Sequence, residues 1–116
     1  HDSAFAAVSH LPHLLAFAYM NGIASQPDGQ AFMDLAGPGF RDFTRIAAGE
    51  PNLWRDVLLA NRDQVLRQSQ HFRKALDELE EMMRTGNVTD LEQAITEASQ
   101  LRGQWKLGSS TESPDA

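Results

Sequence analysis

The 116-residue sequence contains no cysteine, so it can form no disulfide and offers no thiol chemistry, which fits a reducing compartment. It is also poor in basic residues: 10 lysines and arginines against 16 aspartates and glutamates leave a net charge of −6. Nucleic acid is therefore not an expected partner, because the phosphate backbone requires a basic surface. The longest apolar run, residues 5–20, is interrupted by His10, Pro12 and His13 and is too short to span a membrane, so we expect no membrane partner.

The residues that are present favour one helical domain. The length is typical of a single domain, and 41% of the residues are hydrophobic, which is enough for one core. Leucine and alanine dominate the apolar set and β-branched residues are few, so helix is favoured over sheet. The sequence starts without Met and directly in an apolar helical pattern, so we expect it to be cut from a longer protein.

Polar residues interrupt the most apolar segment at Ser9, His10, Pro12 and His13. A proline inside a helix lacks an N–H and clashes with the carbonyl four residues earlier, so the helix should bend or restart there. His10 and His13 are three residues apart and share one helix face. Two interpretations stay open on this evidence: hydrogen-bonded core histidines, or a polar ligand pocket. We expect no bound metal, because zinc needs further ligands and there is no cysteine to supply them.

Helical spacing of apolar residues extends through most of the chain. Gly37-Pro38-Gly39 should interrupt this pattern, since it cannot continue a helix. A capping box, Thr89-Asp90-Leu91-Glu92, should begin the last helix. We predict helices at about residues 2–24, 30–36, 40–48, 51–84 and 89–105.

The predicted helix of about residues 51–84 is the longest, because no helix breaker occurs within it. Its second half carries an apolar stripe that includes Val65, Phe72 and Leu79. A helix of this length is longer than a domain of this size, and its apolar stripe calls for a second chain. We therefore expect a dimer.

A second polar cluster follows the glycine-rich turn. Arg41 and Arg45 share a helix face, and Asp42 is three residues before Arg45, close enough to pair with it. Cations near a helix start gain nothing from the helix dipole, so their presence suggests a bound anion, which arginine can hold with two parallel hydrogen bonds. The alternative is a solvated helix face with an Asp–Arg pair.

Three segments together resemble the C-terminal helical domain of prephenate dehydrogenases, over about residues 1–105. They are the Ser9–His13 segment, residues 37–47 (GPGFRDFTRIA), and the segment that starts Pro51-Asn52-Leu53-Trp54-Arg55-Asp56. The resemblance implies an all-α helical bundle that forms a dimer. It assigns residues 1–105 to a dimerisation and substrate-binding domain, and residues 106–116 to a polar C-terminal tail.

The resemblance also implies an enzyme of tyrosine biosynthesis in the cytoplasm. In that family an N-terminal Rossmann domain binds NAD or NADP and carries the catalytic histidine. Hydride passes from prephenate to the nicotinamide with loss of carbon dioxide, which gives 4-hydroxyphenylpyruvate. Neither the dinucleotide fingerprint nor the catalytic histidine lies in this sequence, so the chain alone should be inactive.

By resemblance, the substrate site uses Ser9, His10, His13, Gly39, Asp42, Arg45 and Trp54. Arg45 should bind a substrate carboxylate, and His13 should hydrogen-bond the substrate. Asp42 should orient Arg45, the backbone at Gly39 should approach the ligand, and Trp54 should close the pocket across the dimer. Ser9 and His10 should shape the same pocket.

Three alternatives stay open from the sequence. The substrate can be arogenate instead of prephenate, and the resemblance does not decide between them. The chain can also be a non-catalytic helical dimer that binds tyrosine as a regulator. The third alternative is a purely structural interaction module in which His10 and His13 are core residues.

Overall fold

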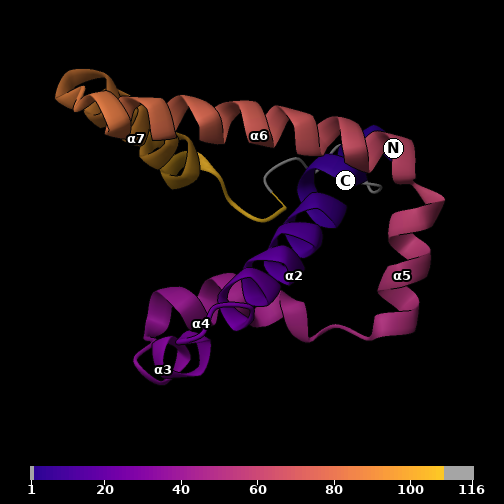
Figure 1. Ribbon diagram of the computed structural model, residues 1–116. Helices are drawn as coiled ribbons and strands as arrows, with labels where there is room; N and C mark the ends of the chain where they lie inside the picture. Colours follow the sequence, from indigo (N-terminus) through magenta and orange to yellow (C-terminus); the bar gives the residue numbers. More distant parts are fainter. Residues whose placement is uncertain (1, 109–116) are drawn as a thin grey trace. The chain divides into compact units, whose positions relative to one another are not determined.

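Figure 1 shows the computed structural model, which describes residues 2–108 as helices joined by short connections. No strand occurs within these residues, so the predicted all-α class is confirmed. The chain divides into two compact units, His1–Ser69 and Gln70–Ala116. No helix among the described residues is both long and apolar enough to cross a membrane.

The first helical stretch contains a π-helical turn directly before the proline. It consists of α1 (Asp2–Phe5), the π turn η1 (Ala6–His10) and α2 (Leu11–Ala24). The N–H of Leu11 donates to the carbonyl of Ala6, five residues earlier, and so widens the helix where Pro12 has no N–H to offer. The predicted irregularity at Pro12 is confirmed, and the chain stays helical through it.

The next helices are α3 (Gly29–Asp34) and α4 (Pro38–Thr44), followed by the 3-10 turn η2 (Arg45–Ala48). The prediction that Gly37-Pro38-Gly39 interrupts the helices is wrong for its last two residues. Only Gly37 lies outside, as the extended N-cap, whereas Pro38 and Gly39 form the first turn of α4. Proline fits this position because the first N–H groups of a helix have no partner within it.

The single long helix predicted for residues 51–84 is wrong. The chain forms α5 (Pro51–Ala60) and α6 (Arg62–Thr85), with a sharp turn at Asn61 (Figure 1). Asn61 has φ −114° and ψ 30°, outside the helical range. Its backbone N–H still donates to Val57 and its carbonyl still accepts from Val65, so the turn costs little backbone hydrogen bonding.

α2 is the centre of the first unit. It contacts α3, α4 and η2, which lie at its C-terminal end in Figure 1. The ring of Tyr19 packs against Phe40 and Phe43, with centroid distances of 6.1 and 4.9 Å. Among the described residues the buried apolar side chains are few: Ala6, Leu11, Ala16 and Val65. A single chain therefore buries only a small core.

The second unit contains the later part of α6 and α7 (Val88–Gln104). Gly86, with φ 66°, ends α6 in the left-handed conformation that glycine adopts without strain. The predicted capping box at Thr89 is wrong: Asn87 is the N-cap, and its side chain accepts from the N–H of Asp90. Residues 109–116 of the predicted polar tail lie outside the described part of the chain.

Candidate functional site

Two histidines of the first helical stretch contact Trp54, at the start of α5. The rings of His13 and Trp54 stack, with centroids 3.5 Å apart and planes 15° apart. His10 meets the same ring edge-on at 6.3 Å, and Phe17 does so at 6.5 Å. Three rings from one helix face thus hold one tryptophan, which creates an aromatic wall next to two imidazoles.

The π turn gives His13 a defined orientation. Its Nδ1 lies 2.8 Å from the carbonyl oxygen of Ser9, four residues earlier. A carbonyl oxygen can only accept, so Nδ1 carries the hydrogen and the neutral ring keeps Nε2 as an acceptor. The part of Ser9 that acts here is its backbone carbonyl.

His10 is held by a different partner. Its Nδ1 lies 3.3 Å from the amide nitrogen of Asn61, at the turn between α5 and α6. The same nitrogen donates to the backbone carbonyl of Asp2 at 2.8 Å. The structure therefore brings together four of the predicted site residues: Ser9, His10, His13 and Trp54.

The other predicted site residues form a separate group on α4 and η2. Asp42 pairs with Arg41, with Nε and Oδ1 3.1 Å apart, and both side chains are exposed. The role of Asp42 in orienting Arg45 stays a prediction. Arg45 is exposed as well, and Gly39 has open space around it. No hydrogen bond, ion pair or ring contact between described residues joins this group to Trp54.

A cavity of about 600 Å³ lies beside Trp54. Trp54 is the only predicted site residue that lines it, together with Phe17, Met20, Asn21, Phe40, Thr44, Ala47, Ala48, Gly49, Pro51, Arg55 and Leu58. The lining is mostly apolar, and Arg55 is its one charged side chain. The cavity is thus suited to an apolar or aromatic group with a negative charge near Arg55.

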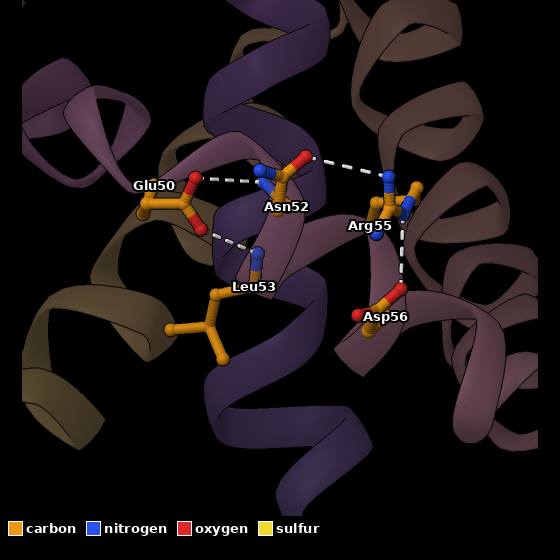
Figure 2. A network of polar contacts seen from close by, with 5 residues as sticks. All are labelled: Glu50, Asn52, Leu53, Arg55 and Asp56. Carbon is orange, nitrogen blue, oxygen red and sulfur yellow. Dashed lines mark hydrogen bonds and ion pairs between the residues drawn. The ribbon is translucent and has the colours of Figure 1, made fainter.

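A short polar network fixes Arg55 (Figure 2). Its Nε donates to Asp56 at 2.9 Å and its Nη1 to the side-chain oxygen of Asn52 at 3.3 Å. Glu50 caps α5 by accepting from the backbone N–H groups of Asn52 and Leu53, at 3.1 and 2.6 Å. No role was predicted for Arg55 from the sequence, although it directly follows Trp54 and is followed by an acidic partner.

Gly49 was likewise not predicted as a site residue from the sequence. A Cβ placed there would lie 2.8 Å from both Cδ1 and Nε1 of Trp54. The glycine therefore lets the backbone touch one edge of the indole, while His13 covers one of its faces. Among the described residues, no group of three or more histidine, aspartate or glutamate side chains is placed to hold a metal ion.

Comparison with known proteins identifies the family of this chain. The family described as "Prephenate dehydrogenase, dimerization domain" matches residues 1–97. The chain is 36% identical over 74 residues to a cyclohexadienyl dehydrogenase of Zymomonas mobilis, covering 62% of this chain and 25% of that protein. It is 34% identical over 107 residues to a prephenate dehydrogenase of Lactococcus lactis, covering 88% of this chain and 29% of that protein.

Solved structures agree. The Aquifex aeolicus prephenate dehydrogenase in complex with hydroxyphenyl propionate and NAD+ has a TM-score of 0.82 and 37% identity, over 90% of this chain and 37% of that one. The Synechocystis arogenate dehydrogenase has a TM-score of 0.84 and 28% identity, over 91% of this chain and 39% of that one. The chain spans about a quarter of the length of the curated relatives that it matches. It belongs to the prephenate dehydrogenase dimerization-domain family.

Proposed function

We propose that this chain is the substrate-binding and dimerisation domain of an NAD(P)-dependent prephenate dehydrogenase. The complete enzyme transfers hydride from prephenate to the nicotinamide, with loss of carbon dioxide, and produces 4-hydroxyphenylpyruvate for tyrosine biosynthesis in the cytoplasm. A Rossmann domain outside this chain binds the NAD or NADP and supplies the catalytic histidine. The 116-residue chain alone is therefore inactive.

The observation that carries this proposal is the stack of His13 on Trp54, with His10 at the ring edge. An aromatic wall beside a hydrogen-bond acceptor suits a six-membered ring that carries a hydroxyl group. The related Aquifex enzyme binds hydroxyphenyl propionate, a ring with a hydroxyl and a carboxylate. His13 accepts from the substrate through Nε2, and Trp54 forms a wall of the pocket in its own chain, where it stacks on His13. Closure of the pocket by Trp54 across the dimer stays a prediction.

Arg45 is the proposed partner of the substrate carboxylate. It is exposed and forms no ion pair with another described residue, so its guanidinium is free to bind a ligand. Prephenate is a dianion, and a protein of net charge −6 can bind it only where positive charge is concentrated locally. In this proposal Gly39 lies beside the ligand and Asp42 orients Arg45, in addition to its pair with Arg41.

The choice between prephenate and arogenate is tested together with the activity. Arogenate is the second candidate substrate, because one structural relative is an arogenate dehydrogenase. The intact enzyme should be assayed with each substrate and with NAD+ or NADP+. Reduction of either cofactor with prephenate supports the proposal. Tyrosine binding in calorimetry without any turnover would instead favour a non-catalytic regulator.

The role of His13 is tested by His13→Ala in the intact enzyme. Loss of one hydrogen bond and one ring stack, together about 1–3 kcal/mol, should lower kcat/KM roughly 5- to 150-fold. The matched control is His71→Ala, which removes an exposed histidine of α6. An equal loss of activity in both variants, or none in His13→Ala, would contradict the site.

A further inference from the structure

We infer that Asn61 is a positioning residue that holds His10 as a neutral hydrogen-bond donor toward the substrate pocket. The inference rests on the proposed function, since it concerns how His10 serves that pocket. No role was predicted for Asn61 from the sequence. The structure places it at the turn between α5 and α6, within reach of two other elements.

The orientation of the Asn61 amide is determined by the backbone of Asp2. Its carbonyl oxygen can only accept, so the side-chain atom 2.8 Å away must be the amide nitrogen, not the amide oxygen. That nitrogen carries two hydrogens. One is used on Asp2, and the other is available for His10 Nδ1 at 3.3 Å.

This geometry selects one tautomer of His10. Because Asn61 donates to Nδ1, Nδ1 must be the bare nitrogen, and the hydrogen of the neutral ring lies on Nε2. His13 has the opposite tautomer, since its Nδ1 donates to Ser9. One turn of helix therefore presents a donor nitrogen on His10 and an acceptor nitrogen on His13, and both rings contact Trp54.

The same residue explains why the helix turns there. Asparagine has only moderate helix propensity, and its side chain readily binds backbone groups elsewhere. At Asn61 the side chain reaches residues 59 and 51 positions away, in α1 and η1. The turn between α5 and α6 and the orientation of His10 thus depend on one amide group.

A double-mutant cycle in the intact enzyme tests this inference. Asn61→Ala should lower kcat/KM about 3- to 10-fold, mainly through KM, as expected for one net hydrogen bond. In a His10→Ala background the same change should cost less than about 2-fold, because its effect passes through His10. Additive effects would overturn the inference, as would an unchanged kcat/KM in Asn61→Ala.

Gln64→Ala is the matched control. Gln64 joins α6 to α1 at the same junction by accepting from the Ser3 hydroxyl at 3.2 Å, and none of the hydrogen bonds between described residues links it to His10. It should leave kcat/KM within about 2-fold of wild type. If it matches Asn61→Ala, the effect comes from docking of α1 and the inference is wrong.

Ring nitrogen shifts of 15N-histidine in the intact enzyme give a readout that does not depend on activity. In the wild type, His10 should show a bare Nδ1 and His13 a bare Nε2, and Asn61→Ala should change the His10 pattern alone. A hydrogen on His10 Nδ1 in the wild type would overturn the inference. An enzyme with the expected shifts but no activity on prephenate or arogenate would contradict only the proposed function.

Discussion

Arg45 is an exposed cation at the end of α4, and the structure gives it no internal partner among the described residues. Arg45→Ala in the intact enzyme should remove one charge-assisted contact worth about 1.5–3 kcal/mol and lower kcat/KM roughly 10- to 150-fold. Most of the loss should appear as a raised KM if the contact is to the carboxylate that stays on the product. Steady-state kinetics measure both constants.

The control for Arg45 is Arg67→Ala, which removes an exposed arginine of α6 in the same unit. Its kcat/KM should stay within about 2-fold of wild type, and both variants should keep the wild-type Tm. If Arg45→Ala lowers the Tm and leaves the kinetics unchanged, Arg45 is structural and the carboxylate site lies elsewhere.

Gly49 tests whether the position of Trp54 matters. Gly49→Ala would place a Cβ 2.8 Å from two atoms of the indole ring, so the ring must move. Overpacking of this kind costs about 1–3 kcal/mol, and we expect a lower Tm together with a higher KM. Thermal unfolding measures the Tm, and steady-state kinetics of the same preparation measure the KM.

Gly22→Ala is the contrast to Gly49. Gly22 lies in α2, and a Cβ there would meet nothing within 4 Å. Alanine in a helix interior is favoured over glycine by about 0.5–1 kcal/mol, so this variant should be at least as stable as wild type. If Gly49→Ala and Gly22→Ala have the same Tm and the same KM, Trp54 has room to move.

Among the elements, the π turn before Pro12 links the sequence most directly to the site. Pro12→Ala restores an N–H that can donate to the carbonyl of Val8, so the turn can relax to a regular α-helix. We expect an unchanged or higher Tm, because an interior proline is removed, but a lower kcat/KM, because His10 shifts away from Asn61. Activity at the wild-type level with a relaxed helix would show that the π turn has no functional role.

The elements that depend on local signals could be predicted from the sequence. Pro12 has one physical effect wherever it stands in a helix, so the irregularity there was predictable. The turn at Asn61 was not, because asparagine alone is a weak helix breaker and the partners that bind its side chain lie 51 and 59 residues away. The start of α7 was misjudged because Asn87, directly after Gly86, caps the helix before Thr89 can.

The candidate site was also predictable only where a local signal in the sequence marks it. His10 and His13 could be recognised as polar residues within an apolar helix. The contact between His13 and Trp54 joins residues about 40 positions apart, which no local pattern can indicate. Only the family resemblance predicted that the histidines and Trp54 belong to one site. Asp42 has the neighbouring Arg41 as its partner in the structure, and its role toward Arg45 stays a prediction.

At the scale of the whole molecule, one chain leaves much apolar surface in water. Of the described apolar side chains, only Ala6, Leu11, Ala16 and Val65 are buried. Large apolar residues of α6 and α7 remain exposed, including Leu76, Ile95 and Leu101 at 41%, 57% and 70%. Burial of such surface against a second chain is the usual way in which a small core becomes stable.

We therefore expect a homodimer that buries well over 1,000 Å² in total and uses the apolar residues of α6. Phe72→Glu should raise the dimer dissociation constant at least about 100-fold, because an unpaired charge at an interface core costs several kcal/mol and each 1.4 kcal/mol is tenfold. Gln70→Glu adds the same charge at an exposed polar position of α6 and should leave the dimer intact. Light scattering across a micromolar dilution series measures both variants. A wild-type chain that is monomeric there would contradict the dimer, and equal dissociation of both variants would place the interface away from the stripe of Phe72.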